Sequence, residues 1–335
     1  MANRRKNLAI LLVSELGENA SPDDMATLEQ ASDIAGALTA LGFSPETLPF
    51  RTDLARIRKE LESRRPAIVV NLVETLFGGG NLVHIAPALL EQLGIPFLGS
   101  GSSALFMTSH KLCAKRIMRA CRIPTPDWLE APRWEGLNEG TRYIVKCANE
   151  DASVGIDAKS VVSGRKALLA RVHRAEEERP GIWFAEEYVE GREFNVTLIE
   201  GPEGPEVMPL AEMTFIDYPP DRPRIIDYEA KWMEGTFAFE ITKRRFIDEA
   251  AEAGLAHPIR KAACDAWNAF GLRGWARVDF RIDEAGNPFA IDVNANPDLT
   301  DGIGVAAAAA RAGIAYKELV GRIVERAIAH YEARA

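Results

Sequence analysis

The chain has 335 residues, of which 47% are apolar, and its formal net charge is -9 at pH 7. Single hydrophobic cores seldom grow to this chain length, so we expect a globular protein with two or three lobes. The chain has no long basic block and no apolar run near the roughly 20 residues of a membrane-spanning helix. Nucleic acid and membranes are therefore not expected partners. The start of the chain lacks the apolar region of a secretion signal, which predicts a cytoplasmic location.

The cysteines and histidines predict no covalent or metal framework. The four cysteines are scattered, and the histidines include no pair at the spacing of one helical turn. We therefore expect reduced cysteines in the core and neither a zinc site nor a catalytic thiol.

The first hundred residues alternate short apolar runs with amphipathic stretches. The apolar runs cover residues 8–13 and 67–72, and the amphipathic stretches cover residues 24–41 and 82–93. This alternation predicts a parallel sheet covered by helices. A helix is expected next over residues 109–119.

The rest of the chain predicts a small α+β lobe followed by a larger one. The middle lobe should contain strands over residues 143–146, 160–162 and 182–187 and a charged helix over 164–178. An irregular region is expected between residues 216 and 239, and a loop of this length in a compact domain is disordered or functional. The expected elements after it are a helix over residues 247–270, a hairpin over 274–293 and two final helices.

The hairpin is the sharpest chemical signal in the sequence. Side chains alternate between the two faces of a strand, so each strand should have an apolar face and a polar face. The expected polar side chains are Arg277 and Asp279 on the first strand and Asp292 and Asn294 on the second. The expected apolar side chains are Ala276, Val278, Phe280 and Ile282 on the first strand and Phe289, Ile291 and Val293 on the second.

The register of this hairpin decides whether the polar side chains meet. If residues 284–287 form the loop, Asp279 lies opposite Asp292 and Arg277 lies opposite Asn294. Two facing carboxylates repel each other unless a cation lies between them. Two carboxylates and an amide oxygen suit Mg²⁺, with Mn²⁺ as an alternative. A solvated polar sheet face is the other interpretation of the same pattern.

Three lysines lie in extended or irregular segments, namely Lys111, Lys146 and Lys231. Each alone is most often a solvated surface charge. Lys146, however, ends an apolar strand, where an ammonium group usually has a partner. Residues 149–155 follow it, and their small side chains and backbone amides suit a loop over phosphates, although this segment taken alone favours a simple hairpin turn.

Taken in order, these pieces resemble the D-alanine–D-alanine ligases and the wider ATP-grasp superfamily over nearly the whole chain. The matching segments are residues 93–100, 111, 145–146, 153–155, 186–194, 228–231, 274–279 and 292–294. The resemblance implies an α/β and α+β chain with a three-lobed ATP-grasp fold and an N-terminal parallel-sheet domain. The implied domains are 1–108 on the substrate side, 109–190 as the central lobe, and 191–335 with the metal site and a mobile loop over 218–239.

The resemblance also implies a role for each matching residue. Lys111 and Lys146 would contact the α- and β-phosphates of ATP, Ser153 would lie in the loop above them, and Lys231 would reach the γ-phosphate. Glu186, Glu187 and Val189 match the positions that hold adenine, and Glu193 matches the carboxylate that binds ribose. Asp279, Asp292 and Asn294 match the Mg²⁺ ligands, and Arg277 matches the arginine that steadies the acyl phosphate.

The activity implied by the resemblance is an ATP-dependent, ADP-forming ligase that joins a carboxylate to an amine through an acyl phosphate. Its partners would be small molecules, an acid and an amine of the amino-acid or short-peptide class, and a homodimer is left open. Two alternatives belong to other classes. One is an ATP-grasp protein that binds a nucleotide or amino acid without turnover. The other is an oxidoreductase, because residues 99–104 fit a dinucleotide-binding fingerprint, although they do not open the first βαβ unit.

The substrate pocket is expected to depart from the family pattern. The family's serine in the phosphate loop is replaced by Ala152, the tyrosine after the Tyr-Glu-Ala-Lys motif by Trp232, and a serine for the second substrate by Ile303. Residues 73–77 replace a His-Gly segment, and Glu15 and Glu18 lie in an unfamiliar setting. Several lost hydrogen bonds would remove affinity for D-alanine, which is therefore not the expected natural substrate.

Overall fold

The N-terminal region contains a parallel sheet, as predicted. The computed structural model describes residues 5–15, 22–76, 79–131, 134, 136–150, 153–219 and 222–333, without the side chains of residues 5, 6 and 22–24. The sheet has the strand order β2-β1-β3-β4, formed by β1 (Arg5–Ser14), β2 (Ser44–Phe50), β3 (Pro66–Leu72) and β4 (Phe97–Leu98). The helices α1 (Pro22–Ala40), α2 (Leu54–Arg64) and α3 (Ile85–Leu93) accompany it, and a 3₁₀ turn (Gly80–Leu82) precedes α3. Strand β2 and helix α2 were not predicted, because α2 buries only Ile57 and Leu61.

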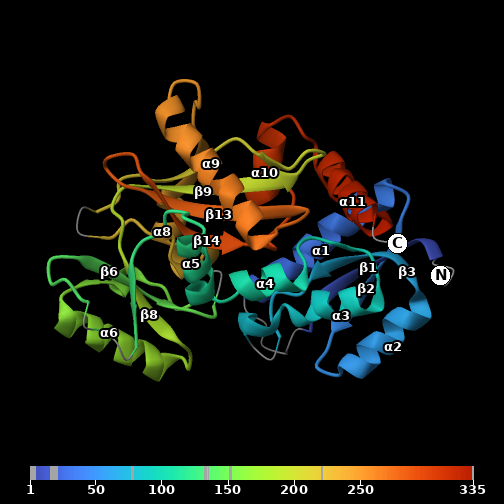
Figure 1. Ribbon diagram of the computed structural model, residues 1–335, viewed down its shortest axis with the longest axis horizontal. Coiled ribbons are helices and arrows are strands. Elements are labelled where there is room, and N and C mark those ends of the chain that lie inside the picture. Colours follow the sequence, from blue (N-terminus) through green and yellow to red (C-terminus); the bar gives the residue numbers. More distant parts are fainter. Residues whose placement is uncertain are drawn as a thin grey trace.

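The middle region is a four-stranded antiparallel sheet with one long helix. Its strands are β5 (Trp128–Glu130), β6 (Arg142–Cys147), β7 (Val161–Ser163) and β8 (Trp183–Glu187), in the order β5-β8-β6-β7. Helix α6 (Arg165–Glu178) packs on this sheet, which lies apart from the N-terminal sheet (Figure 1). Helices α4 (Ser102–Thr108) and α5 (Lys111–Ala120) connect the two regions, and a 3₁₀ turn (Ala158–Ser160) precedes β7.

The third sheet contains the hairpin whose polar side chains were predicted to meet. Its strands are β9 (Arg192–Glu200), β10 (Pro205–Val207), β11 (Ala211–Phe215), β12 (Thr242–Phe246), β13 (Trp275–Ile282) and β14 (Pro288–Asn294). They run in the order β12-β11-β9-β13-β14, and β10 pairs with β9. Helix α9 (Ala253–Phe270) packs on the apolar face, where Phe194, Val278 and Phe280 are fully buried. The polar side chains of β13 are thereby left on the opposite face.

The last two helices return to the N-terminal sheet. Residues of α10 (Gly304–Arg311) and α11 (Tyr316–Glu332) share a core with β1, β3 and α1. Figure 1 shows α11 beside α1, at the end of the molecule that holds both termini. The core therefore joins the first and last parts of the chain, and the division into 1–108, 109–190 and 191–335 stays a prediction.

Two predicted elements differ from the structure. The helix expected from residue 247 begins at Ala253, because the carboxylate of Asp248 accepts hydrogen bonds from the amides of Ala250 and Ala251 and holds a turn there. The region expected to be irregular contains two short helices, α7 (Tyr228–Trp232) and α8 (Phe237–Ile241). Within the described ranges, no helix has the length and apolar character needed to cross a membrane.

Candidate active site

The hairpin β13–β14 brings the four predicted polar residues together. Asp279 pairs with Asp292 and Arg277 pairs with Asn294, as predicted. The end of the hairpin was predicted wrongly, because Pro288 pairs with Ile282 and the loop is one residue longer. Between the pairs Phe280–Ala290 and Asp279–Asp292, β14 has one extra residue, which forms a bulge. This bulge offsets the longer loop, so Asp279 and Arg277 have their predicted partners.

The bulge also changes which side chains of β14 face the site. Ala290 and Val293 are buried in the core under α9, whereas Ile291 lines the same cavity as Asp292. The prediction that Ile291 lies on the apolar face was therefore wrong, because an inserted residue reverses the alternation of faces. On β13 the alternation holds, and Arg277, Asp279 and the unpredicted Arg281 line the cavity.

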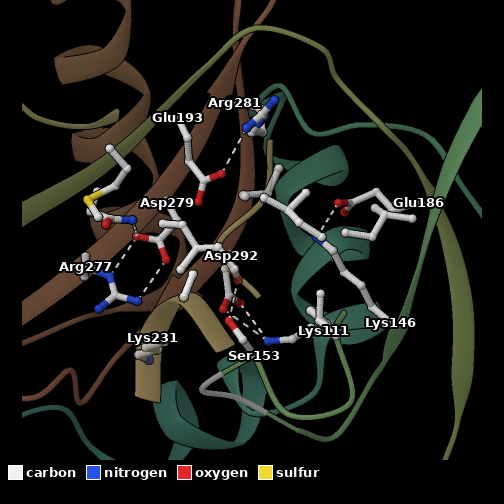
Figure 2. A pocket seen from close by; sticks show the side chains of 18 of the residues that line it. Lys111, Lys146, Ser153, Glu186, Glu193, Lys231, Arg277, Asp279, Arg281 and Asp292 are labelled. Carbon is white, nitrogen blue, oxygen red and sulfur yellow. Dashed lines mark hydrogen bonds and ion pairs between the residues drawn. The ribbon is translucent and has the colours of Figure 1, made fainter. Parts of the chain in front are cut away.

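Each carboxylate of the facing pair has a cationic partner of its own (Figure 2). Asp279 accepts two hydrogen bonds from Arg277, at 2.7 and 2.9 Å, and one from Asn195 at 2.8 Å. The Nζ atom of Lys111 lies 3.1 Å from both oxygens of Asp292. Burial alone would raise the pKa of Asp292, but Lys111 and more distant cations hold it below its usual value. The predicted repulsion is thus offset by side chains.

The same oxygens fit a Mg²⁺ ion that arrives with a nucleotide. Two carboxylates and the amide oxygen of Asn294 are hard ligands, and Mg²⁺ usually completes its octahedron with waters and substrate phosphates. Asn294 Oδ1 already accepts the amide of Asn296 at 2.9 Å, which leaves it one further lone pair. Among the described residues, no group of three or more His, Cys, Asp or Glu side chains could hold a metal without such help.

A buried triad of charges lies across the cavity from this hairpin. Glu186 on β8 accepts one hydrogen bond on each oxygen, from Lys115 and from Lys146, both at 2.6 Å. Lys115 also donates to Thr125 at 2.8 Å. Burial would raise the pKa of Glu186, but the two lysines hold it below its usual value. Burial also lowers the pKa of Lys115, a residue that was not predicted for the site.

The segment after β8 leads to a second buried ion pair. Arg281 donates to the carboxylate of Glu193 at 3.0 Å and to the backbone carbonyl of Val189 at 2.9 Å. Burial raises the pKa of Glu193 against the opposing effect of Arg281. Glu187 and Val189 line the same cavity. The residues expected at the adenine and ribose therefore line one cavity.

These residues surround a cavity of about 320 Å³, called here the first cavity. Ser153 lines it with a positive φ of 63°, and its hydroxyl donates to the carbonyl of Ile226 at 2.7 Å. Lys231 reaches it from α7, with its Nζ atom 5.1 Å from the centre of the Trp232 ring. The segment that contains α7 therefore forms part of the cavity wall, in contact with the loop that carries Ser153.

A second cavity of about 250 Å³ adjoins the first. Residues from the N-terminal region, among them Gln30 and Glu74, form one wall, and Asn294, Asp298 and Ile303 form another. Both cavities are lined by five shared residues, which are Glu150, Val154, Lys231, Arg277 and Gly304. The structure thus places Asn294 at the second cavity and the carboxylates Asp279 and Asp292 at the first.

The segment that fits the dinucleotide-binding fingerprint, residues 99–104, packs against other side chains of the protein. The carboxylate of Glu91 accepts hydrogen bonds from the amide and the hydroxyl of Ser102, at the start of α4. A side chain at Gly101 would meet Glu91 and Arg273 within 3 Å. Packing, and not phosphate binding, therefore explains these small residues.

Comparison with known proteins identifies the family. The sequence profile described as "D-ala D-ala ligase C-terminus" matches residues 137–325. This chain belongs to the D-alanine–D-alanine ligase family. It is 32% identical to a protein named D-alanine–D-alanine ligase of Synechococcus sp. (strain JA-2-3B'a(2-13)), over 76% of this chain and 74% of the relative. It is 29% identical to the uncharacterized protein y4sG of Sinorhizobium fredii, over 80% and 77% of the two chains.

The solved structures agree on the fold of this D-alanine–D-alanine ligase family member. A D-alanine–D-alanine ligase from Bacillus anthracis, complexed with ATP, has a TM-score of 0.74 at 19% identity, covering 98% of this chain and all of that chain. The predicted ATP-grasp fold, with its N-terminal parallel sheet, is confirmed. The family assignment also confirms an ATP-dependent, ADP-forming ligase of this type.

The charged residues that the sequence did not predict include Arg281, which lines the first cavity, Asp298, which lines the second, and Lys115, which is buried behind Glu186. Arg281 could have been found, because it follows Asp279 by two positions on the same face of a strand. Lys115 lies inside a helix rich in lysine and arginine, where a charge is normally exposed. Asp298 follows the strand in a loop, and no sequence pattern showed that this loop turns back toward α1.

Proposed function

We propose that this enzyme activates a carboxylate with ATP in the first cavity and transfers the acyl group to an amine in the second. The observation that supports this division is the shared wall, where Lys231 and Arg277 line both cavities. A transferring phosphoryl group at that wall would be within reach of both molecules. Three further points stay predictions, namely the domain division 1–108, 109–190 and 191–335, a homodimer and a cytoplasmic location.

The nucleotide would lie along the first cavity, with its base at the Glu186, Glu187 and Val189 segment and its ribose at Glu193. Its phosphates would then extend toward Lys111, Lys146, Ser153 and Lys231. Glu186 is paired with Lys115 as well as with Lys146, so it offsets only part of the positive charge of Lys146. Lys146 could therefore still attract the phosphates. If Asp292 bound a metal ion, its ion pair with Lys111 would break, and Lys111 would be available to the phosphates.

Asp279, Asp292 and Asn294 would hold Mg²⁺, with Mn²⁺ as an alternative, and the ion would supply positive charge against the phosphate oxygens. Asp279 has to be released from Arg277 for this role. The released guanidinium would then be available to the acyl phosphate and to the oxyanion that forms when the amine attacks. The protein's contribution to this chemistry is positioning and electrostatic stabilisation.

The reaction has two steps. A carboxylate oxygen of the acid attacks the γ-phosphorus and ADP leaves, while Lys231 and Arg277 offset the developing charge. The amine then attacks the acyl carbon and loses a proton, an amide bond forms, and the bond between the acyl carbon and the bridging oxygen breaks, so that phosphate leaves with that carboxylate oxygen and can take up the proton. Water would destroy the acyl phosphate, so we expect the segment of residues 218–239 to close over it. Ile216, Met233 and Phe237 of this region are about half exposed in the structure and offer an apolar surface for closure.

The substrates would be an amino acid and an amine of the amino-acid or short-peptide class, but not D-alanine. Trp232 and Ile303 both line the second cavity. Neither offers the hydroxyl group that a tyrosine or serine would provide. Glu15 forms an ion pair with Arg51 at the protein surface. Glu18, Phe77 and Ala152 lie outside the described residues.

The test is a screen of ADP release. Purified protein with Mg²⁺ and ATP would be offered acid and amine pairs, including D-alanine alone, and the mass of each product would be measured. We expect ADP release that depends on both substrates and a product of acid plus amine minus water. Efficient synthesis of D-alanyl-D-alanine would contradict only the substrate claim. Nucleotide binding without ADP release under any pair would contradict the ligase proposal.

A further inference from the structure

The second cavity contains a carboxylate that is held rigidly by one of its oxygens. Asp298 Oδ1 accepts three hydrogen bonds, from Gln30 Nε2 at 2.7 Å, from the Thr300 amide at 2.8 Å and from the Thr300 hydroxyl at 2.6 Å. Among the described residues, no donor to Oδ2 and no ion pair of Asp298 is found. Asp298 is thus a fixed negative charge with one oxygen left for another molecule.

The loop around Asp298 is tied to both of its neighbours. Trp275 donates to the carbonyl of Pro297 at 2.7 Å, and Asp33 of α1 accepts the amide of Asp301 at 3.0 Å. Leu299 is fully buried. The position of the carboxylate is therefore set by the protein before any ligand binds, which lowers the conformational cost of binding.

The two cavities differ in their balance of charge: among the described residues, six basic and six acidic side chains line the first, whereas two basic and three acidic side chains line the second. Among the described residues, the lysines and arginines of the second cavity are Lys231 and Arg277, which also line the first cavity and would contact the phosphates there. Of the described charged residues that line only the second cavity, both are acidic, namely Glu74 and Asp298. Asp298 is close enough to Arg277 to contribute to the raised pKa of that guanidinium. Asp33 and Asp301 add further negative charge beside the loop.

Resting on the proposed function, we propose that the second cavity binds a basic substrate, an amino acid or short peptide with a cationic side chain whose charged group lies on Asp298 Oδ2. The attacking amine has to be unprotonated at the acyl phosphate, so an ammonium group that stays on a carboxylate is a second cationic group. A zwitterionic amino acid with an uncharged side chain would place no cationic group on Asp298 Oδ2. A dicarboxylic substrate would be repelled by it.

Three amino acids of similar length test this assignment. Lysine has a terminal ammonium group, norleucine replaces it with a methyl group, and 2-aminoadipate carries a carboxylate there. Dissociation constants would be measured by calorimetry with Mg²⁺ and a nonhydrolysable ATP analogue present. We expect lysine to bind about tenfold or more tightly than norleucine, with 2-aminoadipate the weakest. Tighter binding of norleucine or 2-aminoadipate, or binding of none of the three, would overturn the proposal.

Variants localise the effect. Asp298→Asn should reduce the ratio of lysine to norleucine affinity to near one, and an unchanged ratio would overturn the proposal. Thr300→Val keeps the charge of Asp298 but removes one of its hydrogen bonds, so the ratio of lysine to norleucine affinity should fall severalfold. This variant replaces Asp298→Asn as the test if Asp298→Asn does not fold. Asp265→Asn removes an exposed charge on α9 and should leave the ratio unchanged. An equal fall in this control would assign the preference to net charge and overturn the role of Asp298.

The proposal and the ligase function can fail separately. A preference for lysine that depends on Asp298, without ADP release under any acid and amine pair, would support the binding site and contradict the ligase. ADP release with neutral amines alone would support the ligase and contradict the basic substrate.

Discussion

The two cavities differ in how their charges are balanced. In the first cavity, ion pairs join Asp292 to Lys111, Glu186 to two lysines and Glu193 to Arg281. In the second cavity, Asp298 has hydrogen bonds on one oxygen but forms no ion pair within the described chain. The first region is a set of paired charges that a nucleotide and metal would rearrange. The second is a preformed acceptor, and substrate specificity should therefore be decided there.

The largest effect is expected from the metal position. Asp292→Asn should reduce ADP release by more than about a hundredfold, since even outer partners of a metal ion are worth 10–100-fold. The fold should survive, because the change relieves the repulsion between the facing carboxylates and asparagine keeps an oxygen that can accept a hydrogen bond from Lys111. Steady-state kinetics at ordinary Mg²⁺ would measure this. Glu284→Gln, an exposed change at the tip of the same hairpin, is the control, and similar turnover in both variants would remove Asp292 from the metal site.

The next effect is on the free energy of unfolding, and it distinguishes the ion-paired residues of the first cavity from Asp298 in the second. Glu186→Gln leaves two lysines without their carboxylate, one of them the fully buried Lys115, and should lower the free energy of unfolding by about 3–5 kcal/mol at pH 7. The folded pKa of Glu186 lies below its usual value, so its contribution is present at neutral pH and is lost as the pH falls through the folded pKa. The difference between the two proteins should therefore narrow in acid.

Urea unfolding of wild type and Glu186→Gln at several pH values would measure this difference. A difference that is constant down to acid pH would show that the charge of Glu186 does not stabilise the fold.

A smaller change is expected in the segment that contains α7. Trypsin can cleave after Arg224 and Lys231, and we expect slower cleavage there when Mg²⁺ and a nonhydrolysable ATP analogue are present. Cleavage after Lys59, on the exposed side of α2, provides the internal reference. Mass spectrometry of the fragments would report both rates. If nucleotide leaves the ratio of the rates unchanged, the segment does not close over the site.

The smallest effect is expected for stability in the second cavity. Asp298→Asn keeps an oxygen that can accept the bonds from Gln30 and Thr300, and it leaves no buried cation unpaired. The free energy of unfolding should change by less than about 1 kcal/mol. Urea unfolding measured beside Glu186→Gln would compare the two regions directly. A loss as large as that of Glu186→Gln would show that Asp298 serves the fold and not a ligand.

The chemistry of the strands was predictable from the sequence because two-residue alternation fixes the face of each side chain. Arg277, Asp279 and Asp292 were found in this way. The bulge at β14 was not predictable, because an extra residue in one strand has no signature in composition or alternation. As a result Ile291 was placed on the wrong face.

The charges contributed from outside the strands were harder to predict. The partnership of Lys115 with Glu186 joins residues 71 positions apart, and that of Gln30 with Asp298 joins residues 268 positions apart. No local pattern contains such a pairing. The parallel sheet and the helices with regular apolar spacing were predicted well, whereas β2, α2, α7 and α8 were missed because they bury few side chains.

The central claim is that a carboxylate is activated as an acyl phosphate where the two cavities meet. It is tested most directly with an acid substrate whose carboxylate carries ¹⁸O, turned over with Mg²⁺, ATP and the amine identified by the screen. One labelled oxygen should appear in the released phosphate, in equal amount with ADP and amide product. Unlabelled phosphate, or AMP and pyrophosphate in place of ADP and phosphate, would contradict the account.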